Sequence, residues 1–158
     1  AGNGAEAGRE AEAIDAIVRT TDFTGLDAAG IPADRIATLS RHVVLARIAQ
    51  SRGDQETALV EFRKAAAIED TLSYMEPPYW YYPVRQSLGA VLLQTGQAAE
   101  AERAFRASLA KAPHNGWALY GLTEALRAQG RTAEAEQTAE RLARAWAGDR
   151  SQLALNKL

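Results

Sequence analysis

The residue types that most often carry catalysis or bind metals are scarce in this sequence. The chain contains no cysteine, which excludes disulfides, thiolate metal ligands and cysteine nucleophiles. Its two histidines, His42 and His114, fit neither an HxxxH nor an HExxH pattern. We expect His42 to pack among apolar neighbours on a helix, and His114 to lie in an exposed turn. The sequence therefore predicts no metal site and no cofactor.

Catalytic motifs are equally hard to find. The sequence has no Gly-rich phosphate loop, no G-x-S-x-G elbow and no paired-aspartate signature. Its carboxylates fall largely in the expected first turns of helices, where the helix dipole favours acidic residues. Glu100, Glu102, Glu134 and Glu136 are examples. We expect them to be solvated charges with a structural role, and we expect the protein not to be an enzyme.

The overall charge argues against two classes of partner. Eighteen basic residues against 20 acidic ones give the 158-residue chain a formal charge of −2. This balance favours neither nucleic-acid binding nor a polybasic membrane anchor. Charged or amide residues also interrupt every apolar stretch, so we expect no membrane insertion. We therefore expect a soluble protein. The Ala- and Arg-rich, Lys-poor composition suggests a bacterial source, and the compartment, cytoplasm or periplasm, stays open.

The elements that position these residues are expected to be helices arranged as repeats. Alanine supplies 34 residues, and β-branched residues are scattered singly, which favours an all-α fold. One short phrase recurs four times, beginning at Gly8, Gly53, Gly96 and Gly130. In each copy a glycine suited to ending one helix precedes an Ala- and Glu-rich stretch suited to starting the next. Each phrase is therefore predicted to be the corner of a helical hairpin.

These residues resemble the tetratricopeptide repeat, whose 34-residue unit carries W-x2-L-G-x2-Y, then A-x3-F, then P. The best copy spans residues 82–115, with Leu88-Gly89, Ala101, Phe105 and Pro113 at the corresponding positions. Less regular copies follow at 116–149 and precede at 34–72. The resemblance implies an α-solenoid of stacked antiparallel hairpins, with a right-handed superhelical twist. We treat residues 1–158 as a single domain of this kind.

The resemblance also implies a binding face. In this family the first helices of the units line a concave surface that commonly holds a peptide or a partner helix. The corresponding positions here are Arg47, Gln50, Gln86, Trp117, Tyr120, Glu124 and Arg127, with Val43, Ala90 and Leu93 between them. The function implied is a non-catalytic scaffold that binds a protein or peptide. Packing of Trp117 and Tyr120 against the preceding connection is the alternative for those two rings.

An aromatic insert interrupts the regular spacing at residues 73–82. Five of the 11 aromatic residues lie between Tyr74 and Tyr82, and the segment also contains consecutive prolines that disfavour helix. Tyr79, Trp80 and Tyr81 could bind a small ligand or peptide. The alternative is that the rings only cover the ends of adjacent hairpins.

The chain ends complete the prediction. Residues 8–20 resemble the second helix of a further unit that lacks its first, so we expect the natural protein to continue upstream of Ala1. Residues 21–33 are predicted to be a linker. Residues 150–158 form a tail whose leucines we expect to pack on the last helix.

Two other functions remain open from the sequence. The aromatic insert could make this chain the small-ligand-binding accessory domain of a larger enzyme. Alternatively, the open ends of the stack could make it a self-association module, and so a homo-oligomer.

Overall fold

The computed structural model describes residues 4–158, so the expectation about Ala1 lies outside the described residues. The chain divides into two compact units, unit 1 from Ala1 to Tyr82 and unit 2 from Pro83 to Leu158. The described residues form helices and no strand, which confirms the all-α prediction. None of the described helices is both long and apolar enough to cross a membrane. The single domain and continuous superhelix stay predictions.

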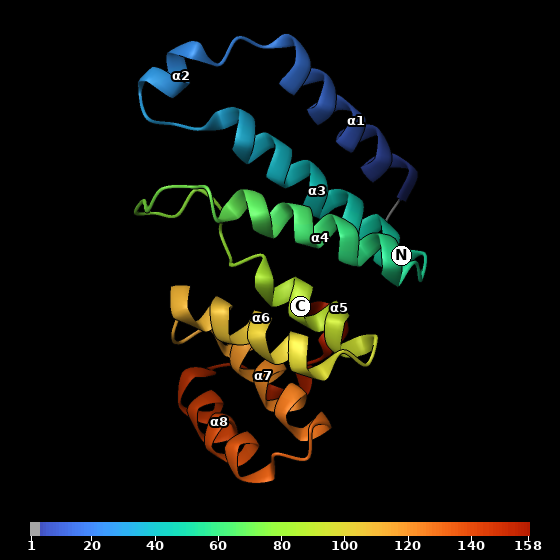
Figure 1. The fold of residues 1–158 in the computed structure, drawn as a ribbon, viewed down its shortest axis with the longest axis vertical. Helices are drawn as coiled ribbons and strands as arrows, with labels where there is room; N and C mark the ends of the chain where they lie inside the picture. The colour runs from blue at the N-terminus through green and yellow to red at the C-terminus, as the bar shows by residue number, and fades with distance from the viewer. Residues whose placement is uncertain (1–3) are drawn as a thin grey trace. The chain divides into compact units, whose positions relative to one another are not determined.

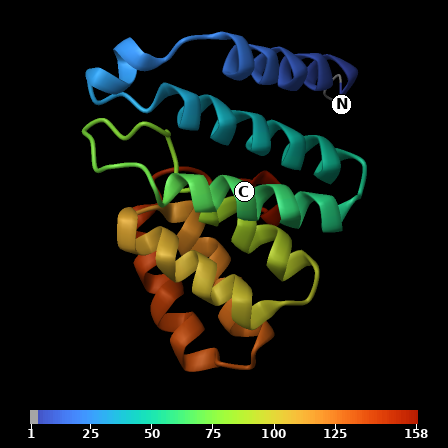
Figure 2. The same ribbon diagram turned by 45° about the horizontal axis from the view of Figure 1, so that its top comes forward.

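Unit 1 is built around one helical hairpin and a third helix packed against it. The helices are α1 (Gly4–Thr20), α2 (Thr24–Ala28), α3 (Ala33–Ser51) and α4 (Gln55–Glu69). Figures 1 and 2 show α3 and α4 side by side and antiparallel, with α1 along the other side of α3. Leu39 and Ala46 of α3 and Phe62 and Ala65 of α4 are fully buried. These residues form the core of unit 1.

The first glycine of the recurring phrase does not form a corner, so that prediction was wrong. Gly8 lies inside α1, which begins at Gly4 rather than at residue 8. The residues around Gly8 are alanines, glutamates and an arginine, and these strong helix formers outweigh the cost of about 1 kcal/mol for one helical glycine. Ala11 is buried, whereas Ile17 is 51% exposed.

The predicted linker at residues 21–33 contains the short helix α2. Asp22 precedes this helix, and its carboxylate accepts hydrogen bonds from the backbone N and Oγ1 of Thr24. The connection therefore has local structure of its own, which the prediction of a plain linker missed.

Unit 2 contains two hairpins and the C-terminal tail. Its elements are α5 (Arg85–Gln94), α6 (Ala98–Lys111), α7 (Gly116–Ala128), α8 (Thr132–Ala145), and the 3-10 helices η1 (Arg150–Gln152) and η2 (Leu155–Lys157). Helix α6 packs against both α5 and α7, and α7 pairs with α8. Successive helices thus bury each other's apolar faces within this unit, as stacked hairpins do.

The other three phrase glycines form hairpin corners, as predicted. Gly53, Gly96 and Gly130 have φ values of 76°, 79° and 71°. Each lies two residues after the end of one helix and two residues before the start of the next. A glycine adopts this left-handed conformation without the penalty that a side chain would impose, which allows the tight turn.

A close contact between α5, α6 and α7 fixes the spacing of unit 2. The ring of Phe105, on α6, is fully buried and lies against Gly89 of α5 and Gly121 of α7. A Cβ atom at Gly121 would lie only 2.2 Å from ring atoms, and one at Gly89 only 2.9 Å. The Phe105 ring can therefore pack between α5 and α7 only because both positions are glycine.

The tail packs on a different helix from the one expected. Leu158 is completely buried, and its carbonyl oxygen accepts a hydrogen bond of 2.7 Å from Ser87 Oγ on α5. Helix η2 likewise packs against α5. Sequence position suggested α8, whereas the hydrogen bond of Leu158 is to the first helix of the unit.

Candidate functional site

Unit 1 contains a cavity of about 450 Å³ on the face of α3. Its walls come from the start of α1, from α3 and from the aromatic insert. The lining residues are Gly4, Ala7, Ser40, Val43, Val44, Arg47, Ile48, Ser51, Trp80 and Tyr81. We call this feature the α3 groove. It brings together two sets of predicted binding residues, one from α3 and one from the insert.

The floor of the α3 groove follows from helical periodicity. The six lining residues of α3 recur every three or four positions, which places them on one side of the helix. Gly4 and Ala7 are three residues apart on α1, so these two small residues lie on the same side of that helix. Small residues on one wall leave space between the two helices for another side chain.

Arg47 supplies the charge in the α3 groove. Its guanidinium lies 5.3 Å from the centre of the Phe62 ring, and its Nη1 donates a 3.0 Å hydrogen bond to Gln50 Oε1. The cation–π contact and the hydrogen bond hold this half-buried cation in one place. Gln50 therefore acts here by positioning Arg47.

The aromatic insert is anchored at one point and exposed at another. Tyr79 donates a 2.8 Å hydrogen bond from its hydroxyl to the carbonyl oxygen of Gly30. Trp80 is half-buried, and its buried Nε1 has no hydrogen-bond partner among the described residues. Tyr81, whose ring centre is 5.1 Å from that of Trp80, is 81% exposed. The insert thus presents one exposed ring, that of Tyr81, beside α3, while the Trp80 Nε1 donor is buried.

The other predicted face residues lie in unit 2 and already have partners there. Gln86 is buried and accepts a 2.7 Å hydrogen bond from Asn115 Nδ2. Trp117 packs edge-on against Trp146, with their ring centres 5.1 Å apart. Glu124 and Arg127 form an ion pair of 2.6 Å with each other. Their binding role stays a prediction.

Tyr120 completes this group on α7. Its ring is half-buried, and burial raises the pKa of its hydroxyl, an effect reinforced by the charge of Glu124. The phenol therefore stays protonated and can donate a hydrogen bond at neutral pH.

Sequence reasoning missed six residues of the α3 groove. Ser40, Val44, Ile48 and Ser51 share the face of Arg47, so the same helical spacing could have identified them. Gly4 and Ala7 gave no comparable signal, because the helix was expected to begin at residue 8.

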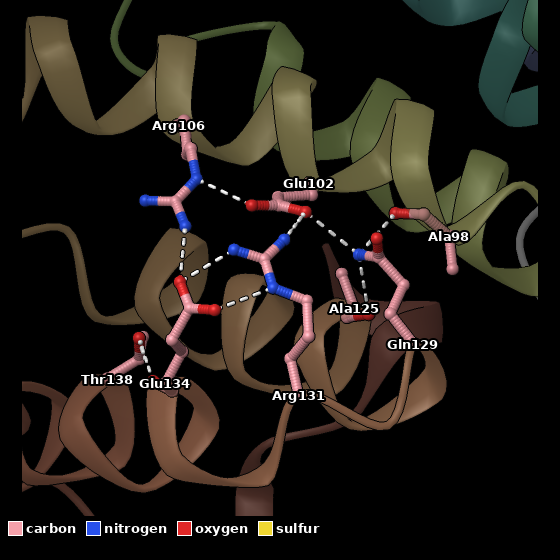
Figure 3. A network of polar contacts seen from close by, with 8 residues as sticks. All are labelled: Ala98, Glu102, Arg106, Ala125, Gln129, Arg131, Glu134 and Thr138. Carbon is pink, nitrogen blue, oxygen red and sulfur yellow. Dashed lines mark hydrogen bonds and ion pairs between the residues drawn. The ribbon is translucent and has the colours of Figure 1, made fainter.

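A polar network in unit 2 also differs from the prediction. Glu102 is not solvated but only 9% exposed. Its carboxylate accepts hydrogen bonds from Arg106, Gln129 and Arg131, and Arg131 also pairs with Glu134 (Figure 3). Burial opposes ionisation of Glu102, but these donors outweigh it and hold the pKa of the carboxyl below its usual value. The network links the second helices of two hairpins.

His42 has a polar partner, which the prediction of simple apolar packing did not include. Its Nδ1 lies 2.6 Å from Oε2 of the buried Glu61, and Lys64 Nζ lies 2.6 Å from Oε1. Burial opposes ionisation of Glu61, but Lys64 and His42 together keep the pKa of its carboxyl low. Within residues 4–158, no cluster of three histidine or acidic side chains could hold a metal ion.

Comparison with known proteins agrees with the hairpin architecture. Residues 92–157 match the family model of the tetratricopeptide repeat. The matched segment runs from the end of α5 to η2. The match lies entirely within unit 2, and repeats of this family generally mediate protein–protein interactions. No curated protein and no solved structure matches the chain.

Proposed function

We propose that this chain is a non-catalytic interaction module of the tetratricopeptide-repeat kind, and that it binds an extended peptide segment of a partner protein in the α3 groove of unit 1. The observation that carries the proposal is the meeting of Val43 and Arg47 with Trp80 and Tyr81 around one cavity. The lining combines an apolar floor, one held cation and two aromatic rings. This is the composition of a surface that anchors one or two side chains of a peptide.

The contacts of the lining residues support a peptide more than a flat protein surface. Tyr81 is exposed and can close over a bound side chain, since tyrosine gives a large contact area at low entropic cost. The Trp80 ring also lines the groove and adds contact area for a peptide side chain. Arg47 can donate to a carboxylate or a second carbonyl.

The proposal is tested by selecting peptides from a random displayed library on the intact chain and measuring their affinities by fluorescence anisotropy. Tyr81→Ala should weaken binding about tenfold, because exposed aromatic anchors commonly dominate such contacts. Tyr74→Ala is the matched control. Tyr74 belongs to the same insert, is 86% exposed and does not line the groove, so its removal should leave affinity unchanged.

Three outcomes would contradict the proposal. One is that no peptide is selected, and another is that Tyr81→Ala and Tyr74→Ala weaken binding equally. The third is that the groove binds a small molecule with fused rings but binds no peptide. That result would favour the alternative function, an accessory ligand-binding domain. Sedimentation over a range of concentrations addresses self-association, and a monomer throughout is the result expected from a module that binds other proteins.

A further inference from the structure

Unit 2 contains a second cavity, of about 600 Å³, at the end of the α7–α8 hairpin opposite its corner. Three structural elements form it: the connection between α6 and α7, helix α7, and the last turns of α8. Its lining residues are Pro113, His114, Leu119, Arg141, Arg144 and Ala145. We call this feature the basic cleft.

The three basic groups of the basic cleft lack acidic partners. Within residues 4–158, Arg141, Arg144 and His114 make no side-chain hydrogen bond or ion pair. The lining itself contains no acidic side chain. By contrast, other arginines of unit 2 pair with glutamates, namely Arg103, Arg106, Arg127 and Arg131. Uncompensated positive charge is thus concentrated beside this cavity.

Helix stability does not account for both arginines. Arg144 lies in the last turn of α8, where a cation interacts favourably with the helix dipole. Arg141 lies one turn earlier, beyond the range of that effect. Residues three apart on a helix have Cβ atoms about 5–6 Å apart, so the two guanidinium groups can reach one shared ligand.

The remaining lining residues indicate what that ligand carries besides charge. Leu119 is buried at the base, and Pro113 and Ala145 add apolar surface around it. A cavity of about 600 Å³ is much larger than a single small anion. Apolar surface beside cations suits the aliphatic stem and carboxylate of a glutamate, together with its neighbours in a peptide.

We propose that the basic cleft binds an acidic peptide segment of a partner protein, with Arg141 and Arg144 holding its carboxylates and Leu119 contacting its apolar side chains. His114 donates a further hydrogen bond from a ring N–H. The site does not depend on the α3 groove, because every lining residue belongs to unit 2.

The test compares two labelled synthetic peptides on the intact chain, measured by fluorescence anisotropy at low ionic strength. One peptide carries two glutamates three residues apart beside a leucine, and the other carries glutamines in their place. The acidic peptide should bind about tenfold tighter, since guanidinium–carboxylate hydrogen bonds add affinity that amides lack. The double variant R141Q/R144Q should abolish this difference.

The matched control is the double variant R9Q/R52Q. It removes the same charge from two exposed arginines of unit 1 that likewise have no ion pair among the described residues. It should keep the tenfold preference, as should Tyr81→Ala. Equal loss in both double variants would overturn the proposal, because binding would then follow net charge alone. Equal affinity for the two peptides, or displacement of the acidic peptide by inorganic phosphate at equal concentration, would overturn it as well.

Discussion

Glu102 shows how one buried carboxylate joins two repeats. Its donors Gln129 and Arg131 lie 27 and 29 residues away in sequence, on the next hairpin. Local spacing alone identifies Glu102 as an acidic residue near a helix start, which is why its solvation was predicted wrongly. Local spacing does not reveal these partners, because Gln129 and Arg131 meet Glu102 only in the folded chain (Figure 3).

Replacing Glu102 with glutamine should destabilise unit 2 by about 1–2 kcal/mol at pH 7, because Arg106, Gln129 and Arg131 then lose a buried, charged acceptor. The pKa of the Glu102 carboxyl is lower in the folded protein than in the unfolded chain. Glu102 therefore stabilises the fold fully at pH values above its unfolded pKa, and this stabilisation is lost as the pH falls through its folded pKa. Urea unfolding should therefore show a smaller difference between variant and parent at pH 3 than at pH 7. Glu136→Gln, at an exposed position, is the control, and a difference independent of pH would contradict this account.

Two glycine-to-alanine changes should have opposite effects on stability. Gly121→Ala places a Cβ atom 2.2 Å from the buried Phe105 ring and should cost about 2–3 kcal/mol. Gly8→Ala meets no atom within 4 Å inside α1 and should add about 1 kcal/mol. Chemical denaturation measures both changes. If Gly121→Ala were neutral, the proposed packing of Phe105 would be incorrect.

At the scale of elements, the hairpins were predictable and several of their neighbours were not. Glycine spacing located the corners at Gly53, Gly96 and Gly130, because a turn of this kind depends on local backbone conformation. The α3 groove depends instead on where Trp80 and Tyr81 pack relative to α3, about 30 residues away in sequence. The position of the tail was missed for the same reason.

Truncating Leu158 to alanine should destabilise unit 2 by about 2 kcal/mol, because its side chain is completely buried. Amide hydrogen exchange, compared between this variant and the parent protein, then shows whether the tail packs on α5 or on α8. Faster exchange in α5 is expected, since Ser87 and η2 tie the tail there. Faster exchange confined to α8 would instead support the arrangement expected from sequence order.

For the whole molecule, unit 2 should fold without unit 1. It has its own core, and the match to the tetratricopeptide repeat falls inside it. A fragment of residues 83–158 should therefore give a helical circular dichroism spectrum and one cooperative thermal transition. Its size is near the lower end for an independent domain, so modest stability is expected. A fragment that stays unfolded under native conditions would show that unit 2 needs the rest of the chain.

The central claim is that the α3 groove receives a peptide segment of the partner. Methyl NMR of the intact chain, titrated with a peptide selected from the library, tests it most directly. We expect the largest shifts at the methyl groups of Val43, Val44 and Ile48, which line the groove, and small shifts at Leu122 and Leu126 in the core of unit 2. Saturable shifts that leave Val43, Val44 and Ile48 unmoved would contradict the claim.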